Sequence, residues 1–182
     1  MFISKISKYI PQFIMKPAYG IYEGKLIDEI KSEKVPGHIG IIMDGNRRFA
    51  TSKGLPVYMG HEIGMKKAEE LLDWCNEIGV KVITLYAFST ENFKRDPEEV
   101  DFIMKMFEQK FREAATNKKI KENRAKVKAI GNISMLPESL KEAIKVGESA
   151  TEDYDNMTLN ICIAYGGRME IVEAIKRILD SS

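Results

Sequence analysis

The sequence predicts an α/β protein: a single domain with a mainly parallel central sheet and helices on both faces. First, strand-like and helix-like segments alternate four times after residue 37, which is typical of a parallel sheet covered by helices. Second, the strand-like runs are short and apolar, as in strands that are buried on both faces. Third, a length of 182 residues is enough for one domain with its own core.

Each predicted element follows from its apolar spacing. The expected strands are residues 38–43, 80–88, 127–130 and 159–164. The expected helices begin near His61, Pro97, Pro137 and Glu170. Gly79 is placed to end the first of these helices, and Pro97 to open the second at a first-turn position. The predicted domain covers residues 35–182.

Residues 1–34 are predicted to form a separate N-terminal helical segment. Apolar side chains recur at helical spacing from Phe2 to Ile14, and a second helical stretch covers about residues 21–32. The first stretch is compatible with peripheral contact with a membrane surface. The sequence favours instead a helix that packs on the core or on a partner subunit.

Composition excludes several classes of protein. Lys and Arg number 28 and Asp and Glu 27, so the net charge of +1 argues against a nucleic-acid binder. No apolar run approaches the roughly 20 residues of a membrane span, and the N-terminus lacks a secretory pattern, so a cytoplasmic protein is expected. Cys75 and Cys162 lie in apolar settings, and we expect both to be reduced and buried.

Polar residues directly follow the first predicted strand. Gly45 permits a tight turn, and a helix starting near Asn46 would present free N–H groups to an anion. Arg47 and Arg48 add two groups that bind phosphate oxygens. Asp44 suits Mg²⁺, which takes only one or two carboxylates and fills its shell with water and substrate phosphates. The alternative is a helix cap with two solvated arginines.

A second polar loop follows the second predicted strand. It carries the side chains of Ser89, Thr90, Glu91, Asn92, Phe93 and Arg95. Helix capping would also explain Ser, Thr and Asn here. However, both loops should open on the same edge of a parallel sheet, where ligands gather, and this convergence favours a binding site. His61 should lie at the same edge, whereas His38 precedes the first strand and is expected to be structural.

Five ordered stretches resemble the cis-prenyltransferases, the undecaprenyl diphosphate synthase family. They are HIGIIMDGNRRFA at 38–50, GH at 60–61, TLYAFSTENF at 84–93 with Arg95, EV at 99–100, and LNICIAYGGRMEIV at 159–172. The resemblance covers about residue 35 to the end. Phe49 and Phe93 are similar to the archaeal branch, since bacterial members often carry tryptophan at these positions.

The resemblance implies the site residues and their roles. Asp44 would hold Mg²⁺ on the diphosphate of an allylic primer, farnesyl or geranylgeranyl diphosphate. Asn92 would position the reacting groups for attack by isopentenyl diphosphate. The implied diphosphate and pocket contacts are Gly45, Asn46, Arg47, Arg48, Phe49, His61, Ser89, Thr90, Glu91, Phe93 and Arg95. The hydrocarbon would lie between the sheet and the helices carrying Leu71, Ile103 and Phe107. The product would be a long-chain polyprenyl diphosphate, a glycosyl carrier lipid, made by a homodimer in the full-length form.

Two departures from the family pattern leave alternatives open. Val57 stands where many members carry an arginine, and the family's arginine-rich Arg-x-Ser/Gly-Gly-Glu segment does not appear before Ser182. We therefore retain a second hypothesis, an accessory subunit or fragment that binds only the allylic diphosphate. A third is another phosphate-handling enzyme, such as a phosphatase.

Overall fold

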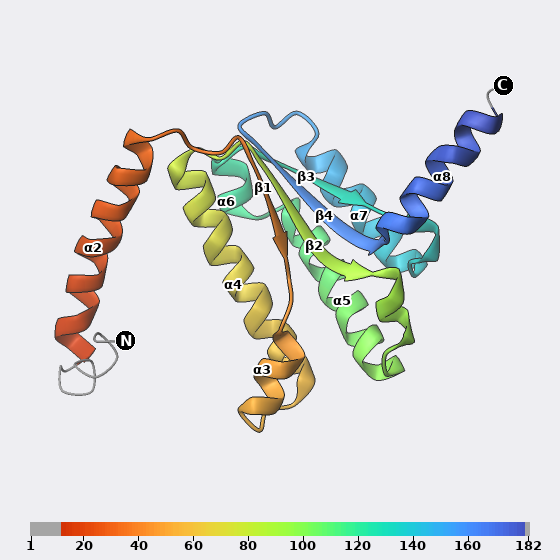
Figure 1. The fold of residues 1–182 in the computed structure, drawn as a ribbon, viewed down its shortest axis with the longest axis horizontal. Coiled ribbons are helices and arrows are strands. Elements are labelled where there is room, and N and C mark those ends of the chain that lie inside the picture. Colours follow the sequence, from red (N-terminus) through yellow and green to blue (C-terminus); the bar gives the residue numbers. More distant parts are fainter. Residues whose placement is uncertain (1–11, 181–182) are drawn as a thin grey trace.

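The computed structural model of the protein describes residues 12–180, with side chains described from residue 20 onward except at residue 173. Its centre is a sheet of four parallel strands in the order β1-β2-β4-β3 (Figure 1). The strands are β1 (His38–Ile42), β2 (Val82–Ser89), β3 (Ala125–Ile130) and β4 (Met157–Tyr165). The predicted parallel sheet is confirmed, and each strand lies within a few residues of its expected place.

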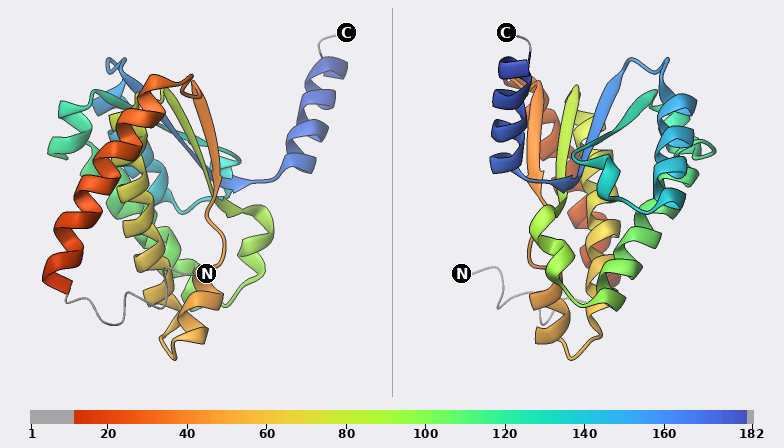
Figure 2. Two further views of the ribbon diagram at one scale, coloured as in Figure 1. Left: turned by 60° about the vertical axis from the view of Figure 1, so that its left-hand side comes forward. Right: turned by 90° about the vertical axis from the view of Figure 1, so that its right-hand side faces the viewer.

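Helices cover one face of this sheet. Figure 2 shows α4 (Val57–Ile78), α5 (Pro97–Ala114) and α7 (Glu138–Thr151) on this face, whereas α8 (Gly167–Asp180) lies toward the other side and projects away from the sheet. The remaining helices are α2 (Gln12–Ser32), which touches α4, and the short α3 (Asn46–Ser52) and α6 (Lys118–Glu122). Two 3-10 turns, η1 (Thr90–Lys94) and η2 (Ile133–Met135), complete the elements. None of the helices within residues 12–180 has the length and hydropathy needed to cross a bilayer.

The core fills the layer between the sheet and the helices α4, α5 and α7. One cluster joins α5 and α7 to the sheet through Phe88, Phe111 and Leu140. A second cluster lies beneath α4 and includes the buried Cys75. Full burial of each large apolar side chain stabilises the fold by about 1.5–3 kcal/mol. Both cysteines are free and buried, as predicted.

The predicted helix boundaries follow their expected physical causes. Gly79 ends α4 with a φ of 89°, a left-handed conformation that favours glycine. Pro97 occupies the first turn of α5, and the side chain of Asp96 accepts a hydrogen bond from the backbone N–H of Glu98 at 2.9 Å. Helix α4 begins four residues before the predicted His61, because residues 57–60 continue the same helix.

The expectation that the first strand is buried on both faces is wrong. β1 is an edge strand whose burial alternates, and the side chain of Ile42 is 75% exposed. Only alternate residues of β1 face the layer of helices, because no described element covers the other face of this strand. The helical spacing noted between Phe2 and Ile14 lies largely outside the described residues. The stretch predicted at 21–32 is the C-terminal part of α2.

The parallel arrangement brings three loops to one edge of the sheet. The chain leaves β1, β2 and β4 at their carboxyl ends, which lie at the same edge. Asp44 follows β1 by two residues, Ser89 ends β2 and Tyr165 ends β4. The predicted convergence of the two polar loops therefore has a structural basis.

Candidate active site

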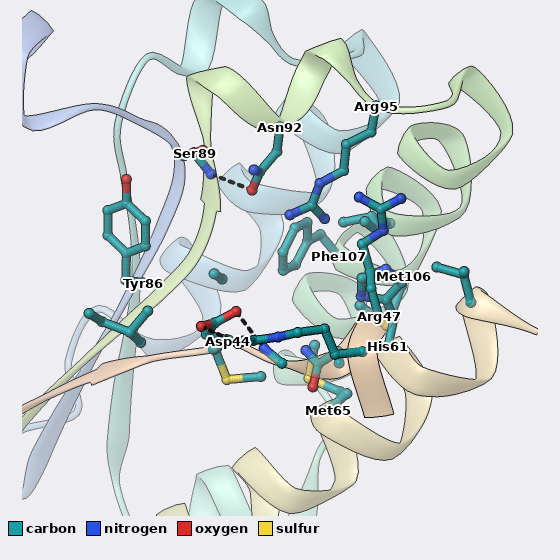
Figure 3. Close-up of a pocket in the computed structure, with 18 of the residues that line it drawn as sticks. Asp44, Arg47, His61, Met65, Tyr86, Ser89, Asn92, Arg95, Met106 and Phe107 are labelled. Atoms are coloured by element: carbon teal, nitrogen blue, oxygen red, sulfur yellow. Dashed lines mark hydrogen bonds and ion pairs between the residues drawn. The ribbon is translucent and has the colours of Figure 1, made fainter. Parts of the chain in front are cut away.

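A cavity of about 800 Å³ lies at this edge, between the ends of β1 and β2 and the helices α3, α4 and α5. Figure 3 shows the labelled polar side chains around it. Nine of the predicted site residues line it: Asp44, Gly45, Asn46, Arg47, Arg48, His61, Ser89, Asn92 and Arg95. Among the charged lining residues, three arginines face one aspartate, so the cavity attracts anions.

The loop after β1 exposes the carboxylate of Asp44 at the cavity. Gly45 has a φ of 92°, which glycine adopts readily, and its N–H donates to Oδ1 of Asp44 at 2.6 Å. Arg48 donates to Oδ2 of Asp44 at 2.8 Å. The side chain of Asp44 is 72% exposed and that of Arg48 is 78% exposed. The ion pair between them is therefore weak, and a bound ligand can rearrange it.

The buried carboxylate of Glu99 on α5 contacts three basic side chains at the cavity. Its side chain is only 8% exposed. Its Oε1 lies 3.0 Å from Nε2 of His61 and 3.1 Å from a guanidinium nitrogen of Arg95, and its Oε2 lies 3.4 Å from Nε of Arg47. Three groups from α3, α4 and the loop after β2 are thereby fixed around one acceptor.

His61 is buried within this cluster, and burial lowers its pKa below the ordinary 6.5. The hydrogen bond and charge of Glu99 act in the opposite direction but are outweighed. A neutral His61 adds no charge, so two guanidinium groups share one carboxylate. The cluster keeps a net positive charge to offer to an anion.

The loop after β2 forms the 3-10 turn η1, closed by a reciprocal capping box. Oδ1 of Asn92 accepts from the backbone N–H of Ser89 at 3.0 Å, and the side chain of Ser89 accepts from the backbone of Asn92. The capping interpretation is therefore correct for these two residues, and both also line the cavity. The carboxamide nitrogen remains the group with which Asn92 can donate to a ligand.

Four of the predicted residues do not line the cavity. Phe93 packs edge-on against Phe88 at 5.0 Å between ring centroids, within the core. Phe49 is 43% exposed on α3, and Glu91 is exposed on η1. Thr90 lies against the loop after β4, since a Cβ added at Gly166 of this loop would lie 2.9 Å from Oγ1 of Thr90. Their roles in substrate binding stay predictions.

The loop after β4 lies beside the cavity. Tyr165 donates to the carboxylate of Glu170, and this contact raises the pKa of Tyr165 to about 12. Tyr86, which lines the cavity, packs edge-on against Tyr165 at 5.6 Å. His38, predicted to be structural, hydrogen-bonds to Thr84 at 2.9 Å on the neighbouring strand.

Several contributing residues were absent from the predicted site. Glu99 belongs to one of the resembling stretches but carries no local signal for a site role, because its partner Arg95 precedes the helix that begins at Pro97. Met65, Tyr86 and Met106 line the cavity without a signal in the sequence, since apolar residues at helical spacing indicate core equally well. Met104, which lies on the same helix as Met106, is a core residue.

A second cavity of about 380 Å³ lies next to the first, between the sheet and the helices α4, α5 and α6. The two cavities share the lining residues Met43, Met65, Ala87 and Phe107. Its other lining is mainly apolar and includes Leu72, Phe111, Ile120 and Leu159. The site therefore joins a cationic mouth to an apolar interior, which suits an amphiphilic anion.

The side chains at the cavity can hold Mg²⁺ only if water and a bound ligand supply most of the coordinating oxygens. Among the described residues, no three His, Cys, Asp or Glu side chains gather into a metal-binding group. The single carboxylate of Asp44 at the anion-binding mouth matches an ion that takes most of its shell from water and substrate phosphates.

The comparisons with known proteins agree with this geometry. The family model described as "Putative undecaprenyl diphosphate synthase" matches residues 42–182. A tritrans,polycis-undecaprenyl-diphosphate synthase (geranylgeranyl-diphosphate specific) from Pyrococcus horikoshii is 51% identical over 97% of this chain and 67% of its own length. A protein of the same name from Pyrococcus abyssi is 49% identical, over 96% and 66%. The chain spans about two thirds of the length of these relatives, whose archaeal source agrees with the resemblance noted at Phe49 and Phe93.

Two solved structures share the fold. Lavandulyl diphosphate synthase from Lavandula x intermedia, in complex with dimethylallyl diphosphate, has a TM-score of 0.76 at 34% identity and covers 84% of this chain and 63% of its own. A probable undecaprenyl diphosphate synthase from Campylobacter jejuni has a TM-score of 0.66 at 32% identity, over 82% and 64%.

Proposed function

Because the chain belongs to the undecaprenyl diphosphate synthase family, we propose that it is a cis-prenyltransferase that condenses isopentenyl diphosphate with an allylic prenyl diphosphate. The names of its relatives favour geranylgeranyl diphosphate as the primer. The product would be a long-chain polyprenyl diphosphate that serves as a glycosyl carrier lipid.

The observation that carries this proposal is the junction of a cationic mouth with an apolar cavity. An allylic diphosphate has the same two parts, a dianionic or trianionic head and a hydrocarbon tail. Arg47 and Arg95, which Glu99 orients, would bind the diphosphate head, and Arg48 would bind it with them. The tail would enter the second cavity past Met65 and Phe107.

The reaction requires the allylic carbon–oxygen bond to break, with its electron pair leaving on the diphosphate. The double bond of isopentenyl diphosphate forms the new carbon–carbon bond at that carbon, and a proton is then lost. The guanidinium groups stabilise the charge that develops on the leaving group. Asp44 would hold Mg²⁺, which when bound adds to this stabilisation. Asn92 is suited to positioning, because a neutral carboxamide is a poor base.

The organisation of the working protein belongs to the same proposal. Residues 1–34 would be an N-terminal helical segment preceding the catalytic domain at 35–182. The full-length form would be a homodimer in the cytoplasm. Contact of the N-terminal segment with the membrane that receives the lipid product is the alternative to its packing on the core or on the partner subunit. Helix α2, which contacts the domain at α4, is compatible with a separate N-terminal segment.

The test is incubation of the purified protein with labelled isopentenyl diphosphate, geranylgeranyl diphosphate and Mg²⁺, followed by chromatography of the lipids. We expect Mg²⁺-dependent labelled product longer than the primer. Asp44→Ala should reduce the rate by at least about a hundredfold while leaving the circular dichroism spectrum unchanged, since the carboxylate is exposed.

Two other outcomes would contradict the proposal. Primer binding without incorporation of label would support the accessory-subunit hypothesis, which the synthase names of the relatives do not favour. Release of free phosphate from the primer would instead indicate a phosphatase.

A further inference from the structure

Two glycines lie one turn apart in the interior of α4, at positions 60 and 64. Glycine is a poorer helix former than alanine, so its presence inside a helix calls for a physical reason. Neither Gly60 nor Gly64 has a positive φ, and the backbone therefore does not require glycine at either position. The reason lies in what the two positions contact.

Both glycines face Asn46, the first residue of α3. A Cβ added at Gly60 would lie 2.3 Å from the backbone carbonyl oxygen of Asn46. A Cβ added at Gly64 would lie 2.3 Å from Oδ1 of the Asn46 side chain and 2.8 Å from its Nδ2. The carboxamide of Asn46 thus occupies the space that a side chain at position 64 would fill.

The two contacts differ in what can move. The carbonyl oxygen at Gly60 belongs to the backbone of α3, so a side chain there would displace the helix. The atoms at Gly64 are the end of a side chain, which can rotate to another conformation. Alanine at position 64 should therefore leave the packing of α3 on α4 intact and turn the carboxamide of Asn46 out of its place.

The carboxamide of Asn46 is available to a ligand. Asn46 lines the cationic mouth of the cavity, as do His61 and Met65 on either side of position 64 in α4 (Figure 3). Its side chain makes no hydrogen bond with any other residue that the structure describes. A carboxamide carries two N–H donors, which can bind an oxygen of a diphosphate. Gly64 itself does not line the cavity.

We propose that Gly64 is a positioning residue, which by lacking a side chain keeps the carboxamide of Asn46 at the cavity wall to bind the diphosphate. This inference rests on the proposed function and adds to it a residue that acts only through another. It also explains why a helix former is missing from this turn of α4.

Binding of geranylgeranyl diphosphate, measured by calorimetry with Mg²⁺, tests this role without depending on turnover. Gly64→Ala should bind the ligand about ten- to a hundredfold more weakly, the value of one charge-assisted hydrogen bond. Its affinity for geranylgeraniol, which has no diphosphate, should not change. Its Tm should stay within about 3 °C of that of the unmodified protein, because the gain in helix propensity opposes the cost of rotating one side chain.

A double-mutant cycle separates positioning from a general effect on the site. Asn46→Ala lacks the atoms that a side chain at position 64 would meet, and Gly45, not Asn46, is the N-cap of α3. In this background Gly64→Ala should cause no further loss of affinity. The matched control is Gly24→Ala in α2, where the added Cβ meets no neighbour and the affinity should be unchanged.

The outcomes distinguish this role from the proposed function. Unchanged affinity in Gly64→Ala, or the same loss with and without the side chain of Asn46, would overturn the positioning role and leave the prenyltransferase proposal standing. A fall in Tm of more than about 5 °C in Gly64→Ala would also overturn it, since the glycine would then serve the fold. Failure of the unmodified protein to bind geranylgeranyl diphosphate would overturn both proposals.

Discussion

Replacing Glu99 by glutamine removes the central negative charge of the site with almost no change in volume. The main loss is the charge-assisted hydrogen bond to the buried His61, worth about 1.5–3 kcal/mol. The pair with Arg95, whose side chain is 26% exposed, adds about 1 kcal/mol. The pair with Arg47, which is 53% exposed, adds little. We therefore expect Glu99→Gln to lower the free energy of unfolding by about 3 kcal/mol.

Urea unfolding provides the measurement, followed by the fluorescence of the single tryptophan, Trp74, and by circular dichroism. For a chain of this size the loss corresponds to a fall in Tm of about 6–12 °C. Glu98→Gln is the matched control, because the neighbouring Glu98 is exposed. Its effect should stay within about 0.5 kcal/mol.

An equal effect of the two substitutions would refute the reasoning. It would mean that the carboxylate of Glu99 contributes no more to folding than an exposed one, and that His61, Arg95 and Arg47 keep their positions without it.

Two further predictions concern α4. Gly60→Ala should destabilise the protein by about 1–3 kcal/mol in urea unfolding, because a Cβ there would lie 2.3 Å from the carbonyl oxygen of Asn46. The control is Gly24→Ala in α2, where the added Cβ meets no neighbour and should instead stabilise the protein. Equal effects of the two substitutions would contradict the predicted clash. The lowered pKa of His61 means that the unfolded chain takes up a proton below pH 6.5 while the folded chain does not, so the free energy of unfolding should fall as the pH drops below 6.5. His61→Gln, which can still donate to Glu99, should flatten this pH profile, and an unchanged slope would show that other groups cause it.

The sequence was informative where chemically distinctive residues directly follow a strand. Asp44 and Arg47 after β1, and Ser89 and Asn92 after β2, could be placed together because parallel strands end at one edge of a sheet. Local rules for glycine and proline also placed the ends of α4 and α5 correctly.

The features that sequence reasoning missed depend on tertiary contacts. Nothing local distinguishes Glu99 from the exposed Glu98, because its burial arises from helices that meet only in the fold. The exposed face of β1 depends on strand order, which alternating elements do not specify. The contact between Lys119 and Asp73 joins residues 46 positions apart in the sequence, so no local pattern could indicate it.

The central claim is that the cationic mouth recognises the diphosphate of a prenyl ligand, and comparison of two ligands with the same tail tests it most directly. Geranylgeranyl diphosphate and geranylgeraniol would be titrated into the protein by calorimetry in the presence of Mg²⁺. We predict that the diphosphate binds at least about a hundredfold more tightly, because charge-assisted hydrogen bonds from the arginines are available only to it. Equal affinities for the two ligands would contradict the account, since the arginines around Glu99 would then contribute nothing to recognition.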